Sequence, residues 1–237
     1  MEYIPALRRT SWEVAASLLL ALLTLIGAVI LLFGANGYVV DFKRLTIEQA
    51  GLIVVRPSVR SAMVSLPSEA KTKQLGQEYV AQLLPGRYDV TVSAPGRTTW
   101  SRIVEVQPGT AAVYGNVTLF YAEPELAVER TADRRDLDVP LVDESILVRD
   151  GELLVRTPDG LVLVSRFSKP IRAARFLDAA HIVYLIGSDV HIIDLDGRSD
   201  VAFAGLCPTG LCRFRIEDNA KTLTLVQALT ARSYRIQ

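Results

Sequence analysis

The chain has 237 residues, with 26 basic and 26 acidic side chains and a formal net charge of zero. Because these charges balance, the composition argues against recruitment to nucleic acid or to an anionic surface, and we expect no nucleic-acid partner. The roughly 200 residues outside an N-terminal apolar run are enough for one or two domains with cores of their own.

Residues 14–33 form an unbroken apolar run without a charged side chain. A helix of this length spans about 30 Å, which matches the hydrocarbon core of a bilayer. Trp12 precedes the run and Tyr38 follows it, as aromatic residues do at membrane interfaces. The sequence therefore predicts a short N-terminal tail over residues 1–11, a transmembrane helix over residues 12–35, and a lipid bilayer as partner.

A cleaved signal peptide and a buried core helix are two other interpretations of this run. A signal peptide carries an apolar stretch of about 7–15 residues followed by an A-x-A-like site. The run here is longer and no such site follows it, so we expect an uncleaved anchor.

Basic residues flank the predicted span on both sides, at Arg8 and Arg9 before it and at Lys43 and Arg44 after it. Basic residues nearest the membrane tend to stay in the cytoplasm, and the two arginines lie closer to the span. We therefore expect a single-pass protein of the cell membrane with a cytoplasmic N-terminus and extracytoplasmic C-terminal domains.

A juxtamembrane linker, residues 36–50, leads into a segment of alternating apolar and polar residues that Pro and Gly interrupt. This alternation predicts a small β-sandwich over residues 51–121. Its residues 68–76 are polar and are predicted to form a loop. The six predicted strands are 51–56, 62–66, 78–84, 87–94, 98–107 and 113–120.

Several residues of this segment match the pattern of the PEGA domain family: Leu84, Pro85, Gly86, Tyr88, Val90 and Val92 in one hairpin, then Gly96, Trp100, Val104, Val106, Pro108 and Gly109. On these residues the segment resembles a PEGA domain. The order of basic tail, single span, PEGA-like domain and β-repeats is similar to that of membrane-anchored PEGA proteins of candidate-phylum bacteria. The resemblance implies a surface-associated β module without catalytic residues, sometimes linked to carbohydrate or envelope binding.

A repeat follows the PEGA-like segment, because residues 153–160 align with 190–197, and 146–149 align with 183–186 at the same offset of about 37. Phe176 and Phe214 mark a fainter third copy. Units of three or four strands with a period near forty are typical of β-propeller blades of the WD40-like kind. The sequence predicts β-propeller-like repeats over residues 122–237.

A closed propeller needs about four to eight blades, and the chain supplies three copies. The last predicted strand, within residues 233–236, runs to the end of the sequence, so we expect an open sheet edge and an uncovered apolar face. Self-association or a protein partner would cover them, and closure into an irregular sandwich or descent from a longer protein are the alternatives. The predicted fold class is mainly β, with one transmembrane helix, a small β-sandwich and an incomplete β-propeller-like array.

Groups with chemistry are scarce in the repeats. His181 and His191 are the two histidines, and both fall in predicted strands, so a solvent-facing or blade-facing role is favoured over catalysis. Asp194, Asp196 and Gly197 suit a tight hairpin better than a calcium loop, because the glutamate that such a loop requires does not follow. No Walker loop, G-x-S-x-G or H-E-x-x-H motif occurs, so we expect no enzyme activity, no cofactor and no metal.

Cys207 and Cys212 are separated by a Pro-Thr-Gly turn that can bring them together. A disulfide is favoured if the domain is extracytoplasmic, and two partly buried thiols are the alternative. A metal site would need two more ligands nearby, and the sequence offers none.

Together these features predict a membrane-anchored, non-catalytic protein of the cell envelope that binds or scaffolds, with a glycan as a candidate ligand. The alternative is an accessory subunit of a larger membrane complex, such as a secretion, pilus or transport machine.

Overall fold

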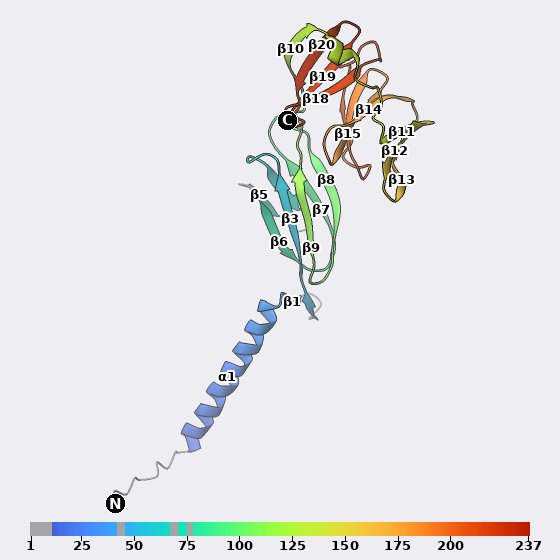
Figure 1. The fold of residues 1–237 in the computed structure, drawn as a ribbon. Helices are drawn as coiled ribbons and strands as arrows, with labels where there is room; N and C mark the ends of the chain where they lie inside the picture. The colour runs from blue at the N-terminus through green and yellow to red at the C-terminus, as the bar shows by residue number, and fades with distance from the viewer. Residues whose placement is uncertain (1–10, 42–45, 67–70, 75–77) are drawn as a thin grey trace, which may run out of the picture. The chain divides into compact units, whose positions relative to one another are not determined.

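The computed structural model describes residues 11–41, 46–66, 71–74 and 78–237. They form one long N-terminal helix, α1 (Ser11–Ala35), a short helix, α2 (Arg134–Leu137), and many short strands in several small sheets, as Figure 1 shows. The predicted fold class, mainly β with a single N-terminal apolar helix, is confirmed.

The strands of the N-terminal half are β1 (Tyr38–Asp41), β2 (Thr46–Gln49), β3 (Gly51–Pro57), β4 (Met63–Leu66), β5 (Lys71–Gln74), β6 (Tyr79–Leu83), β7 (Gly86–Ser93), β8 (Trp100–Val106) and β9 (Ala111–Val117). Those of the C-terminal half are β10 (Glu125–Thr131), β11 (Ile146–Arg149), β12 (Glu152–Thr157), β13 (Gly160–Arg166), β14 (Ile171–Phe176), β15 (His181–Ile186), β16 (Asp189–Asp194), β17 (Val201–Phe203), β18 (Arg213–Glu217), β19 (Thr222–Gln227) and β20 (Thr230–Arg235).

The chain divides into two compact units, which are described separately. The first unit takes its described residues from 1–55, 79–88 and 103–114. The second takes them from 56–78, 89–102 and 115–237. Strands β3, β7, β8 and β9 contribute residues to both units.

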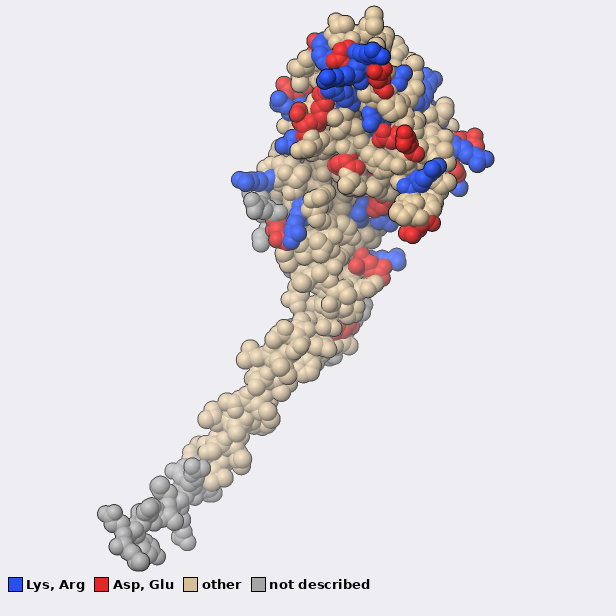
Figure 2. Space-filling model, in the orientation of Figure 1, with Lys and Arg blue, Asp and Glu red and all other residues tan. Residues whose placement is uncertain are grey.

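In the first unit, α1 contains an apolar stretch, Val14–Ala35, that is long enough to cross a membrane and is not buried against other parts of the chain. Figure 2 shows this stretch without acidic or basic side chains on the visible face. Its one threonine, Thr24, donates its hydroxyl to the carbonyls of Ala21 and Leu20, which satisfies that polar group within the helix. By length and composition, α1 fits a membrane anchor or a signal sequence.

A hairpin of β1 and β2 follows the helix within the predicted linker, and Val40 lies opposite Ile47 in its antiparallel register. The next sheet of this unit has the strand order β6-β3-β9. β3 enters this sheet at Gly51, whose backbone is so close to Val106 and Gln107 that a side chain would not fit. The glycine is therefore required by space, since its φ is not in the left-handed region.

A second sheet of this region has the order β5-β4-β7-β8, and β5 corrects the sequence prediction. Residues 68–76 are predicted as a loop, but Lys71–Gln74 pair with β4 in antiparallel register. An edge strand needs only one row of backbone hydrogen bonds and no buried face, so a polar segment can form it without an apolar alternation. The other predicted loop residues, 68–70 and 75–76, lie outside the described residues.

The repeats form three antiparallel sheets, which we name the first repeat sheet (β11-β12-β13), the second repeat sheet (β14-β15-β16-β17) and the third repeat sheet (β10-β20-β19-β18). β15 has buried residues on both faces. Val183 and Leu185 pack with residues of the third repeat sheet, whereas Ile182 and Tyr184 pack with the first. The unbroken apolar sequence of β15 follows from this central position.

The expectation that the last strand forms an open sheet edge is wrong, because this strand, β20, pairs with β10 along its length. β10 therefore supplies the fourth strand of the third repeat sheet from a position before the repeats. The backbone N–H of Tyr121 also donates to the carbonyl of Ile236, 2.9 Å away. Nothing local in the sequence marks this pairing, since the two strands are far apart in the chain.

Candidate functional site

The first repeat sheet exposes a row of leucines that crosses all three of its strands. Leu147 lies opposite Leu154, and Leu154 lies opposite Leu163. Leu147 and Leu163 are 39% and 44% exposed, whereas the alternating residues Ile146 and Leu153 are buried against the second repeat sheet. Since side chains alternate between the two faces of a strand, the packed face is apolar, and the free face carries this row of leucines together with the charged residues Arg149, Glu152 and Arg156. We call this row the leucine face.

The third repeat sheet, at the other end of the array, carries a polar network on its corresponding face. Asp136 of α2 is fully buried there, where it accepts hydrogen bonds from both terminal nitrogens of Arg130 and from Arg215. The Arg130 guanidinium is the main cause that holds the pKa of Asp136 far below its usual range. A capping box joins the backbone and side chains of Asp133 and Asp136 at the start of α2. The array therefore has a buried charge network at one end and a row of leucines at the other.

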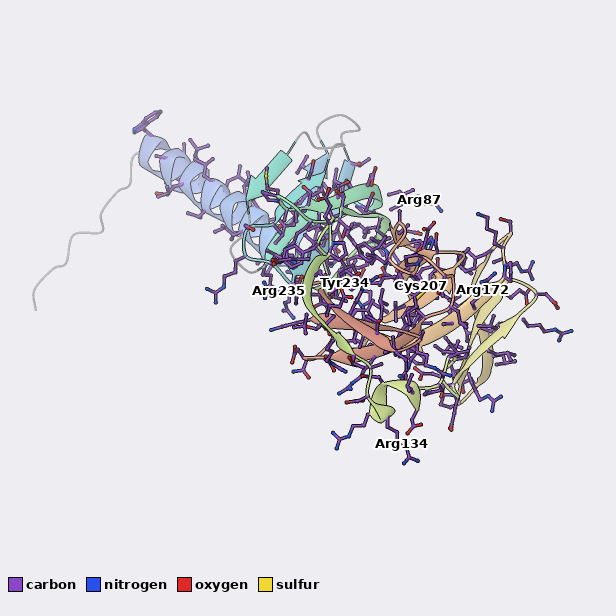
Figure 3. All side chains as sticks on the ribbon, turned by 90° about the horizontal axis from the view of Figure 1, so that it is seen from above. Arg87, Arg134, Arg172, Cys207, Tyr234 and Arg235 are labelled. Atoms are coloured by element: carbon purple, nitrogen blue, oxygen red, sulfur yellow. A yellow bond between two sulfur atoms is a disulfide. The ribbon has the colours of Figure 1, made fainter. Side chains whose placement is uncertain are left out.

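Cys207 and Cys212 are joined by a disulfide in the second unit, with their Cα atoms 6.1 Å apart. Both are buried in the core between the second and third repeat sheets. Figure 3 labels Cys207 and Arg172. The side chain of Arg172 donates to the carbonyl of Gly210 inside the loop, 2.9 Å away. Gly210 has a φ of 66°, which lets the chain reverse between the two cysteines.

His181, which begins β15, lies between two carboxylates and is only 4% exposed. Its Nδ1 is 2.7 Å from an oxygen of Asp178, and its Nε2 is 3.2 Å from an oxygen of Asp194. Burial lowers the pKa of the ring, but the hydrogen bonds and charges of Asp178 and Asp194 more than offset this effect and raise the pKa to about 9. The ring is therefore a buried imidazolium at neutral pH.

Arg102 of β8 extends this network, because its guanidinium is 3.0 Å from Asp194 and 2.7 Å from Asp196. Asp194 thus joins the histidine of one hairpin to an arginine that lies 92 residues earlier in the chain. Gly197 has a φ of 77° in the turn after β16, and its N–H donates to the carbonyl of Asp194. The hairpin interpretation of Asp194, Asp196 and Gly197 is confirmed.

A cavity of about 270 Å³ lies beside this network and is lined in part by Ser58, Asp178 and His181. Ser, His and Asp are the residue types of a hydrolytic triad, but the hydrogen bonds that these three residues make are not those of a triad. A general base needs a free ring nitrogen and a pKa near the working pH, and both nitrogens of His181 already donate to carboxylates. The Ser58 hydroxyl oxygen accepts from the backbone N–H of Leu119. The arrangement serves as an ion-pair network that holds chain segments together.

His191 lies on β16, where its ring stacks on Tyr184 with centroids 4.9 Å apart and its Nδ1 is 3.3 Å from Asp200. Among the described residues, no group of three or more His, Cys, Asp or Glu side chains is arranged to hold a metal ion.

The residues predicted to flank the membrane are only partly described. Trp12 is exposed near the start of α1, and Tyr38 follows the helix with its ring 5.2 Å from that of Phe33. Arg8, Arg9, Lys43 and Arg44 lie outside the described residues.

Sequence reasoning missed the two polar networks. The spacing of Asp133 and Asp136 is the signature of a capping box and could have located α2. Asp178 stands three residues before His181, so a local turn could have suggested their contact. No sequence signal relates Arg102 to Asp194, because only the tertiary structure brings them together.

The geometry defines a mainly β protein with one N-terminal apolar helix. No model of a known protein family matches the chain, and no curated protein is similar to it in sequence.

Proposed function

We propose that the chain is a membrane-anchored, non-catalytic protein of the cell envelope that acts as a binding or scaffolding module. The observation that carries the proposal is the leucine face, because a row of three leucines, two of them exposed, at one end of a stacked array can bind another protein. The apolar stretch of α1, which is unburied along its length, supports the membrane anchor.

In this proposal the residues 51–121 form a PEGA-like β-sandwich, and the repeats are propeller-like blades. The N-terminus lies in the cytoplasm and the β region outside. The disulfide between Cys207 and Cys212 supports that orientation, because disulfides persist in oxidising compartments and are rare in the cytosol. A glycan is a candidate ligand of the PEGA-like module.

The partner at the leucine face is either a second copy of the chain or a different protein. A different protein in fixed stoichiometry would make the chain an accessory subunit of a larger membrane complex, such as a secretion, pilus or transport machine.

Purification from membranes in mild detergent, followed by measurement of mass and of co-eluting chains, tests the proposal. We expect a dimer or a stoichiometric partner for the native chain and its loss in a variant with Leu147→Ser and Leu163→Ser. Leu229→Ser is the matched control, because Leu229 is also an exposed leucine but lies outside the leucine face. A native chain that is monomeric and without a partner would contradict a binding role.

The anchor and its orientation are tested on intact cells. We expect the protein to remain in the membrane pellet after an alkaline carbonate wash, and external protease to digest the β region. A chain released by the wash would contradict the anchor, and a protected β region would reverse the orientation. Binding of the purified protein to a glycan array would identify the glycan ligand.

A further inference from the structure

One face of the hairpin of β1 and β2 is mainly apolar, with Gln49 as its polar residue, and the other face carries Thr46 and Glu48 beside one valine, Val39. Tyr38, Val40 and Ile47 share the first face in the antiparallel register, and they are 38%, 45% and 61% exposed. On the other face the Thr46 hydroxyl donates to the Glu48 carboxylate, 3.2 Å away. An isolated two-stranded hairpin with an exposed apolar face is only marginally stable in water, so this face calls for an apolar environment.

This hairpin is fastened to the end of α1. The N–H of Ala50 donates to the carbonyl of Gly37 at 2.8 Å, and the Gln49 side chain donates to the carbonyl of Asn36 at 3.3 Å. The Asn36 side chain in turn donates to the carbonyl of Leu32 in the last turns of the helix. Both ends of the hairpin are therefore held within a few residues of Ala35, where β1 starts in Figure 1.

The aromatic pair of Phe33 and Tyr38 lies at the same junction, with an edge-on contact of 5.2 Å between ring centroids. Tyrosine prefers the boundary between headgroups and acyl chains, because its ring is apolar and its hydroxyl is polar. If α1 crosses the bilayer, Tyr38 marks the depth at which the helix leaves it. The strand that begins at Tyr38 starts at that depth.

We propose that the apolar face of the β1–β2 hairpin lies in the interfacial layer of the same bilayer that α1 crosses. This inference rests on the proposed membrane anchor and adds a second, shallow attachment to it. Val40 and Ile47 contact the upper acyl chains, while Thr46 and Glu48 face water and headgroups. The hairpin then restricts how far the first unit can tilt or rotate about the helix, because the protein is held at two places instead of one.

Depth-dependent fluorescence on the full chain tests the inference. The chain is reconstituted into phosphatidylcholine and phosphatidylglycerol vesicles after an environment-sensitive dye is attached to a single new cysteine. The native chain, with its cysteines in a disulfide, is the labelling blank. Four variants are compared: Leu25→Cys in the helix, Ile47→Cys on the apolar face, Glu48→Cys on the polar face, and Val80→Cys on β6. Leu25, Ile47 and Val80 are exposed and Glu48 is half-buried, so none of the four labels replaces a core side chain.

We expect nitroxide lipids labelled deep in the acyl chain to quench the dye at position 25, and shallow nitroxide lipids to quench it at position 47. Aqueous iodide should quench positions 48 and 80 several-fold more strongly than position 47. Val80 controls for apolar character alone, because it is 55% exposed but is not on the hairpin.

The outcomes separate the two proposals. A dye at position 25 that lipid nitroxides do not quench would refute the anchor itself. Quenching at 25 with equal iodide access at 47 and 48 would refute the hairpin inference and leave the anchor intact. A dye at 47 protected from both iodide and lipid nitroxides would also refute it, because another protein surface would then cover the hairpin.

Discussion

The buried imidazolium of His181 makes the stability of the second unit depend on pH in a defined direction. Its pKa is about 9 in the folded chain and about 6.5 in an unfolded chain. Below pH 6.5 both states hold the proton and the full stabilisation is present. Between these two values only the folded state holds the proton, so the free energy of unfolding falls as pH rises. Above pH 9 the contribution is lost.

The size of this effect follows from the shift of the pKa, since one unit corresponds to 1.36 kcal/mol. The folded chain should therefore lose about 3 kcal/mol of stability between pH 6 and pH 10 that a variant with His181→Gln does not lose. Other titrating groups contribute equally to both proteins and cancel in the difference. His191→Gln is the matched control, because it removes the second histidine and leaves the network of His181 intact.

Urea unfolding of the full chain in detergent, followed at several pH values by tryptophan fluorescence, measures this difference. A Trp12→Phe background leaves Trp100 as the one tryptophan, and Trp100 is buried in the folded second unit. The reasoning would be refuted if the native chain and the His181→Gln variant lost stability in parallel between pH 6 and pH 10. It would equally fail if His191→Gln, and not His181→Gln, abolished the pH dependence.

Three further results are expected, each read from the same urea unfolding. Asp136→Asn should lower the free energy of unfolding by about 2 to 4 kcal/mol, because it removes the buried charge that two arginines share. Its control, Asp138→Asn at an exposed ion pair, should lower it by less than about 0.5 kcal/mol. Gly51→Ala should cost about 1 to 3 kcal/mol, because its methyl group would overlap the backbone oxygen of Gln107, whereas Gly115→Ala has open space and should be nearly neutral. Reduction of the disulfide should cost about 2 kcal/mol, as expected for a short loop, and an unchanged midpoint would contradict its role in the core.

Much of the strand pattern was predictable from local alternation. β8 is an example, since alternation predicts a strand over residues 98–107, and Trp100, Val104 and Val106 on one face of β8 are all buried. The three copies of the repeat correspond to three sheets, because each copy carries the turn residues and the alternating apolar residues that one sheet requires.

The features that the sequence did not predict depend on contacts between segments that are far apart in the chain. β5 is polar, and its pairing with β4 leaves no apolar pattern in the sequence. Arg102 and Asp194 look like ordinary surface charges until the fold brings them together. The sequence predicted an uncovered apolar face but not its position, because apolar residues on both faces of a sheet do not tell which face is covered.

The pairing of β10 with β20 controls when the repeats can finish folding during synthesis. Glu129 and Arg232, which form an ion pair across these strands, are 103 residues apart, so β10 leaves the ribosome long before its partner exists. The first and second repeat sheets can form from local hairpins as they emerge, whereas the third must wait for β20. Emergence of β20 from the ribosome is thus the event that allows the third repeat sheet to close, and a chain that stops before Thr230 leaves β10 and β19 as unpaired edges.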